Sequence, residues 1–90
     1  MTALQRARLT INEIDKQMAQ LFERRMEAVK MVAEYKKENG IPIDDFAREE
    51  EIIEKNLSYI SCDEYRSYYS DFLSGVIDIS KEMQHRLIDG

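Results

Sequence analysis

Apolar residues recur every three or four positions over the first third of the chain, which is the spacing of one face of a helix. The row consists of Leu4, Ile11, Ile14, Met18, Leu21, Phe22, Val29 and Val32. Gly40 and Pro42 end the pattern, because glycine suits a left-handed cap and proline cannot continue the helical hydrogen bonds. The pattern predicts one long helix from Leu4 to about Lys37.

A second, shorter helix is predicted after the Gly40–Pro42 break. Asp44 or Asp45 supplies a side chain that can cap its first turn. We expect this helix to end near Tyr59 or Ile60. Its predicted buried row consists of Phe46, Ile53, Leu57 and Ile60.

A third helix is predicted to run almost to Gly90. The segment Ser61–Glu64 fits a capping box at its start. Its predicted apolar row consists of Tyr65, Tyr69, Phe72, Val76, Ile79, Met83 and Leu87. No segment shows the alternation of a strand, so the sequence predicts an all-α fold with three helices in a single domain, residues 1–90.

The predicted first helix is too long for a compact monomer of this size. About 34 helical residues at ~1.5 Å each span ~50 Å. A compact chain of 90 residues has a radius of gyration near 12 Å, hence a diameter of about 30 Å. The apolar stripe would therefore be exposed unless a second copy covered it, so we predict an intertwined homodimeric helical bundle.

Composition narrows the function classes. The net charge of −5 argues against nucleic acid or an anionic membrane as the main partner. The N-terminal segment lacks the apolar core of a signal peptide, and no run reaches the length of a membrane span, so we expect a cytoplasmic protein. Cys62 and His85 form no recognisable ligand cluster, so we expect no metal and no cofactor.

Two cations lie on the apolar stripe of the first helix. Ile14, Arg25 and Lys36 are spaced 11 positions apart, and at about 100° per residue they drift only ~20° at each step. Glu49 likewise falls on the apolar side of the second helix. Three charged side chains are thus predicted to face the interior.

The third helix adds two polar residues to this interior. Ser80 and Gln84 continue the row of Leu73 and Ile77. One interpretation is a structural salt-bridge network with snorkelling side chains. The other is a small-anion pocket, because two cations and one carboxylate leave positive charge uncompensated. The pattern alone leaves both open.

Arg8 suggests that such a pocket is shared between chains. It lies 17 residues before Arg25, which is roughly 25 Å along the helix axis. One small ligand cannot easily touch both side chains of one helix. With antiparallel long helices in a dimer, Arg8 of one chain could close the pocket around Arg25 and Lys36 of the other.

These features resemble the all-helical class of chorismate mutases over nearly the whole chain. The segments that carry the resemblance are "ARLTINEIDKQMAQLFERR", "AEYKKENGIPIDDFARE" and "DISKEMQ". The resemblance implies an intertwined dimer that rearranges chorismate to prephenate. It also implies that Arg8 of the partner chain and Arg25 bind the two substrate carboxylates, while Lys36 serves a carboxylate and the ether oxygen.

The remaining implied site residues come from the second and third helices. By the same resemblance, Gln84 donates a hydrogen bond to the ether oxygen, and Glu49 with the region of Asp45 meets the ring hydroxyl. Ser80 and Arg48 would line the side of the ring carboxylate, although the helical wheel places Arg48 away from the apolar row.

The chemistry of this rearrangement agrees with the residues available. An intramolecular reaction requires no nucleophile, metal or cofactor; it requires a folded substrate held in place and donors at the ether oxygen. Isochorismate pyruvate lyase and aminodeoxychorismate mutase share the fold and the carboxylate clamp, and are alternatives. A further alternative is a non-catalytic helical dimerisation or regulatory module, in which Arg25, Lys36 and Glu49 form only a structural network.

Overall fold

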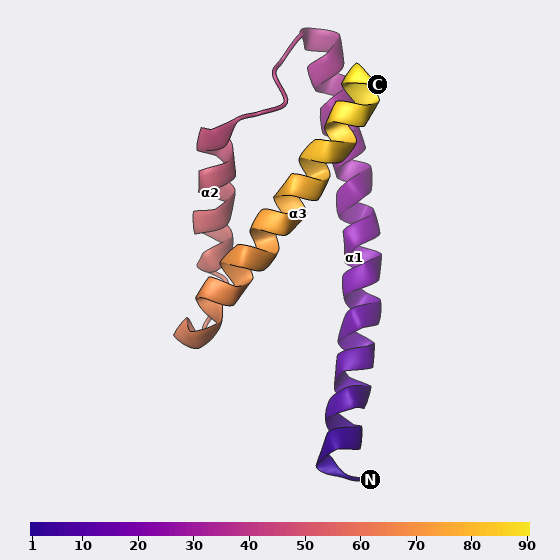
Figure 1. Cartoon of the computed structure of the whole chain (residues 1–90), viewed down its shortest axis with the longest axis vertical. Helices are drawn as coiled ribbons and strands as arrows, with labels where there is room; N and C mark the ends of the chain where they lie inside the picture. The colour runs from indigo at the N-terminus through magenta and orange to yellow at the C-terminus, as the bar shows by residue number, and fades with distance from the viewer.

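The computed structural model describes residues 1–90 as three helices and no strand: α1 (Ala3–Asn39), α2 (Phe46–Leu57) and α3 (Asp63–Asp89). Helix α3 packs against both other helices, whereas α1 and α2 do not approach each other. Figure 1 shows α3 running obliquely from the end of α2 to the C-terminal part of α1. The all-α prediction is confirmed. Because α3 contacts both other helices, it holds α1 and α2 apart from each other.

Local hydrogen bonds define both ends of α1. The Thr2 hydroxyl accepts a hydrogen bond from the Gln5 backbone N–H at 3.1 Å, and the Gln5 side chain accepts one from Thr2 N–H at 2.8 Å. At the other end Gly40 has φ 62°, and its N–H donates to the Lys36 carbonyl. The predicted helix is therefore present, with one more residue at its start and two at its end.

Gly40 provides a test of this left-handed cap. We expect Gly40→Ala to lower the free energy of unfolding by about 1 kcal/mol, because φ is positive there and Ala has a Cβ to strain. Urea unfolding at one fixed protein concentration measures it. Gly75→Ala in α3 is the control: an added Cβ meets nothing within 4 Å, so it should be neutral or stabilising. An equal loss of stability in Gly40→Ala and Gly75→Ala would contradict the role of Gly40 as a left-handed cap.

Helix α2 begins as predicted and ends earlier. The Asp45 side chain accepts a hydrogen bond from the Arg48 N–H at 3.1 Å and so caps the first turn. The predicted end near Tyr59 or Ile60 is wrong, because α2 stops at Leu57. The Ser58 N–H is shared between the Glu54 and Lys55 carbonyls, and the next two N–H groups bond only carbonyls three positions back, so the chain tightens into a turn and the helical ladder does not continue.

The start of α3 also differs from the prediction. Its N-cap is Cys62, whose side chain makes no capping hydrogen bond. The predicted capping box at Ser61–Glu64 is therefore wrong. The helix begins one residue too late for Ser61 to reach its first turn, and a thiol is a poor replacement acceptor.

The buried residues lie where α3 meets α1. Only six side chains are buried: Val29 and Ala33 from α1, and Leu73, Ile77, Ser80 and Gln84 from α3. Several members of the predicted rows are exposed instead, namely Phe46 in α2 and Tyr65, Phe72, Ile79 and Leu87 in α3. Helical periodicity defines an apolar stripe, but the crossing of α3 over α1 decides which part of it is covered.

The N-terminal half of α1 has no neighbour within the chain, as Figure 1 shows. The molecule is 55 Å long with a radius of gyration of 16.4 Å, well above the ~12 Å of a compact chain of this length. The exposed apolar side chains of this half include Leu4, Ile11, Ile14, Met18, Leu21 and Phe22. None of the helices combines the length and apolarity needed to cross a membrane.

Candidate active site

A cavity of about 320 Å³ lies between the C-terminal half of α1, the start of α2 and α3. Seven of the eight residues that the sequence predicted for the site line it; Arg8 does not. Its lining residues are Arg25, Val29, Val32, Lys36, Ile43, Asp45, Arg48, Glu49, Ile52, Ile77, Ser80, Lys81 and Gln84. Polar residues remote in sequence thus converge on one concave, partly apolar space.

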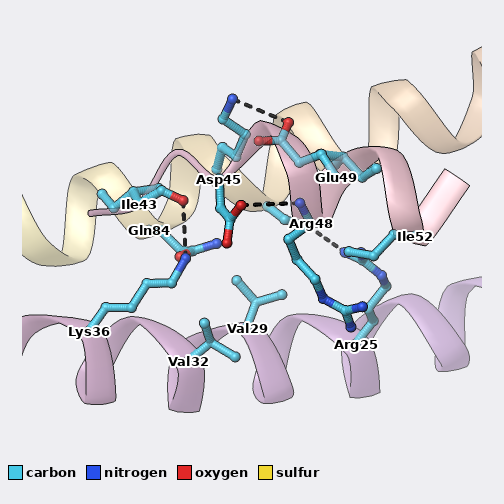
Figure 2. Close-up of a pocket in the computed structure, with 13 residues that line it drawn as sticks. Arg25, Val29, Val32, Lys36, Ile43, Asp45, Arg48, Glu49, Ile52 and Gln84 are labelled. Atoms are coloured by element: carbon cyan, nitrogen blue, oxygen red, sulfur yellow. Dashed lines mark hydrogen bonds and ion pairs between the residues drawn. The ribbon is translucent and has the colours of Figure 1, made fainter. Parts of the chain in front are cut away.

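Helix α1 contributes the floor of the cavity and a cation at each end. Figure 2 shows Arg25 and Lys36 rising from the same face of α1, with Val29 and Val32 between them. The Arg25 guanidinium donates a hydrogen bond to the Ser80 hydroxyl, which donates to the Val76 carbonyl at 2.8 Å. Arg25 is therefore held toward α3, and the 11-residue spacing from Lys36 places the Cα atoms of the two residues about 16 Å apart along the axis.

The loop between α1 and α2 orients Lys36. The Lys36 ammonium donates a hydrogen bond to the Ile43 carbonyl at 3.0 Å (Figure 2). An ammonium has three donors, so this single bond fixes the direction of the side chain and leaves donors available to a ligand. Lys36 is half-buried, with its stem along α1 and its charge at the cavity.

The first turn of α2 presents three charged side chains to the cavity. Asp45 is the helix cap, and Glu49 lies one turn further on. Arg48 also lines the cavity, although the helical wheel placed it off the apolar row; it remains 62% exposed and pairs with Glu51 at 3.5 Å. Arg48 reaches the cavity because it precedes Ile52 by one helical turn, and Ile52 lines the cavity as well.

Lys81 is a site residue that the sequence analysis missed. Its ammonium lies 3.0 Å from Asp44 Oδ1 and 3.4 Å from Glu49 Oε1, and 5.0 Å from the centre of the Phe46 ring. Helical spacing in the sequence could have indicated this position. Lys81 is four residues after Ile77 and three before Gln84, so it lies on the same side of α3 as these two buried residues. Lys81 ties α3 to the loop and to the first turn of α2.

The ion pair with Lys81 gives Asp44 a pH-dependent role in stability. The hydrogen bond from Lys81 is the largest influence on the Asp44 carboxyl and holds its pKa below the ordinary value of 3.8. A group with a lowered folded-state pKa stabilises the fold above its unfolded pKa, and this contribution is lost as the pH falls through the folded pKa. Asp44 therefore stabilises the fold at neutral pH and ceases to do so in acid below 3.8.

We expect Asp44→Asn to be less stable than the wild type near neutral pH, with the difference vanishing in strong acid. Urea midpoints between about pH 7 and pH 2.5 would measure it. Asp71→Asn is the matched control, since Asp71 is an exposed α3 carboxylate outside every ion pair of the chain. A difference for Asp44→Asn that persists unchanged at the lowest pH would contradict the ionic explanation.

Two features indicate that the cavity suits an anionic, hydrogen-bonding ligand. Glu49 Oε2 and Gln84 Oε1 are buried without a hydrogen-bond partner, and both residues line it. Buried polar atoms normally have partners, so these two are candidates for ligand contacts. The lining also holds four cations and two carboxylates, which leaves two formal positive charges: Arg25, Lys36, Arg48 and Lys81 against Asp45 and Glu49. Lys81 and Arg48 pair with carboxylates, so Arg25 and Lys36 are the lining cations that make no ion pair.

Arg8 lies on the exposed N-terminal half of α1, far from this cavity. Within the chain it adjoins only a shallow surface hollow with Met1, Gln5, Leu9 and Asn12. Its separation from Arg25 is 17 residues of continuous helix, or about 25 Å. Arg8 therefore cannot reach the cavity of its own chain.

Comparison with known families agrees with the all-helical fold. Residues 7–85 match the family model described as chorismate mutase type II. The match covers most of the chain, and the chain belongs to this family. No curated protein and no solved structure matches it significantly.

Proposed function

We propose that the protein is a chorismate mutase, an isomerase that converts chorismate to prephenate for phenylalanine and tyrosine biosynthesis in the cytoplasm. The observation that carries the proposal is the cavity with Arg25 and Lys36 at its two ends and two formal positive charges in its lining. Chorismate carries two carboxylates, so its charge complements that excess. Membership of the chorismate mutase type II family supports the same assignment.

Binding geometry supplies the first part of the mechanism. The reaction breaks the ether C–O bond and forms a C–C bond within one molecule, so no atom enters or leaves. The substrate must be folded so that the enolpyruvyl side chain lies over the ring. We propose that Arg25, supported by Ser80, holds one carboxylate and that Arg8 of the partner chain helps to hold the other. Fixing both ends stabilises the folded conformer and removes orientational entropy from the barrier.

Hydrogen-bond donation supplies the second part. Negative charge builds on the ether oxygen as its bond to carbon lengthens. We propose that the Lys36 ammonium and the Gln84 amide donate to this oxygen, and that Glu49 and the region of Asp45 meet the ring hydroxyl. Arg48 and Ser80 would line the ring-carboxylate side. Donors fixed before the reaction stabilise charge that develops only in the transition state, and so raise kcat.

A homodimer would complete the site. We propose that the N-terminal half of α1 packs against a second copy in an intertwined bundle, bringing Arg8 to the partner's cavity. The exposed apolar row of α1 and an extended shape of 55 by 25 by 16 Å support this assembly. A single chain with so few buried residues has too small a core to be stable alone. A folded monomer at micromolar concentration, measured by light scattering, would contradict it.

The deciding assay uses purified protein and chorismate. We expect loss of the ultraviolet absorbance of chorismate, formation of prephenate detected by acid conversion to phenylpyruvate, and no release of pyruvate. Turnover of isochorismate with pyruvate release would instead identify a lyase, and turnover of only the amino analogue an aminodeoxychorismate mutase. Absence of turnover with all three substrates would leave the charged residues as a structural network in a non-catalytic module.

A further inference from the structure

Lys81 is anchored at the boundary of the cavity more firmly than a surface lysine. Its side chain is only 21% exposed, and two carboxylates from different segments, Asp44 and Glu49, lie within 3.4 Å of its ammonium. The Phe46 ring adds a cation–π contact at 5.0 Å. Lys81 therefore has one well-defined position, set by the loop and by α2.

This position determines the electrostatic state of Glu49. Lys81 pairs with Glu49 Oε1, while Oε2 of the same carboxylate is buried and has no hydrogen-bond partner. The Glu49 side chain is also only 21% exposed, so its charge is weakly screened by solvent. Lys81 is shared between Asp44 at 3.0 Å and Glu49 at 3.4 Å, so it offsets part of the Glu49 charge, and Glu49 Oε2 remains available to a ligand.

A carboxylate that already pairs with an ammonium gains less from a second cation than an unpaired carboxylate does. A ring hydroxyl can donate to Glu49 Oε2 without adding charge. The allylic amine of the amino analogue carries a proton at neutral pH, so it would bring a second cation to a carboxylate that Lys81 already pairs with. Like charges around one carboxylate oppose each other, and this disfavours the amino analogue.

We propose that Lys81 is a positioning and specificity-determining residue, which orients Glu49 and offsets part of its charge so that the site favours a ring hydroxyl over a ring ammonium. The inference rests on the proposed function, in which Glu49 meets this position of the substrate ring. Lys81 acts through Glu49 and needs no contact with the reacting atoms.

The test is the ratio of kcat/KM for chorismate to kcat/KM for 4-amino-4-deoxychorismate, measured first in the wild type and then in Lys81→Met. Methionine keeps much of the length of the stem and removes the charge. We expect chorismate turnover to fall and the ratio to move by about tenfold toward the amino analogue, as coupled charged neighbours commonly show. An equal fall for both substrates would mean a merely structural role and would overturn the proposal.

Three further variants make the result specific. Lys81→Arg keeps the charge and should preserve the wild-type ratio. Lys81→Gln removes the charge and should shift the ratio as Lys81→Met does. The glutamine variant serves as the test if the methionine variant does not fold. Arg86→Met is the matched control, since it removes a cation from α3 that pairs only with the exposed Glu82. Arg86→Met should leave kcat/KM for both substrates unchanged; a shift of their ratio in this variant would overturn the inference.

A double variant tests whether Lys81 acts through Glu49. In a Glu49→Gln background Lys81 still pairs with Asp44, but the carboxylate proposed to meet the substrate ring is gone, so adding Lys81→Met should no longer move the ratio toward the amino analogue. A persistent shift would exclude Glu49 as the intermediary. Failure of the wild type with both substrates would overturn the proposed function together with this inference, whereas an active wild type with an unmoved ratio in Lys81→Met overturns the inference alone.

Discussion

Lys36→Ala is expected to lower kcat for chorismate by about a hundredfold to a thousandfold, equivalent to about 3–4 kcal/mol in the barrier. The ammonium is held at the cavity by the Ile43 carbonyl at 3.0 Å, so it is oriented before the substrate arrives. A donor of this kind acts most strongly where charge develops during the reaction. We therefore expect the loss mainly in kcat, with a smaller change in KM from the weakened carboxylate contact.

Stability measurements separate this effect from unfolding. Lys36 makes one hydrogen bond to an exposed loop, so its removal should change the free energy of unfolding by no more than about 1 kcal/mol. Lys37→Ala is the matched control: Lys37 is the adjacent lysine of the same helix and lies outside the cavity. Wild-type kcat in Lys36→Ala, or an equal loss in Lys37→Ala, would refute the role proposed for Lys36.

The second large effect is expected at Arg8, which lies about 25 Å along α1 from Arg25. Arg8→Ala should reduce kcat/KM for chorismate by a factor on the order of a hundred, because one member of a charge-assisted pair with a substrate carboxylate is lost. Arg25→Ala should be similarly impaired. A monomeric enzyme would show no effect at Arg8, because that side chain is far from its own cavity.

Mixing the two inactive variants provides a sharper test of the shared site. In a heterodimer of Arg8→Ala and Arg25→Ala chains, one cavity has an intact Arg25 and receives an intact Arg8, while the other lacks both. An equimolar mixture after subunit exchange should therefore recover about a quarter of the wild-type activity. Arg6→Ala mixed with Arg25→Ala is the control: an Arg6→Ala chain keeps both Arg8 and Arg25, so this mixture should have about half of the wild-type activity both before and after exchange.

The absence of recovery in the Arg8→Ala and Arg25→Ala mixture would contradict the intertwined arrangement, provided that subunit exchange is shown by mass spectrometry. Recovery well above a quarter would also contradict it, because each heterodimer contains only one complete site. Both outcomes are independent of whether Lys81 selects between substrates.

The helices and most of their ends were determined by the sequence alone. Apolar spacing defined α1 within two residues at each end, and Gly40 and Asp45 cap α1 and α2 as predicted. These features depend on interactions between residues three or four positions apart, which the sequence displays directly. Seven of the residues that line the cavity were likewise predicted from polar positions on apolar faces and from the family resemblance. Arg8 was predicted too but does not line the cavity of its own chain, and Lys81 lines it but was not predicted.

The tertiary structure decided what depends on the crossing of helices. Arg25 meets Ser80 across 55 positions, and Lys81 meets Glu49 across 32. No local pattern encodes such pairs: helical spacing could place Lys81 on the side of Ile77 and Gln84, but it could not show that Lys81 meets Glu49 or that Phe46 is exposed. The sequence determined which faces are apolar and which residues carry charge; only the packing of α3 between α1 and α2 decided which of them share one cavity, because that depends on the angle and register of the helices.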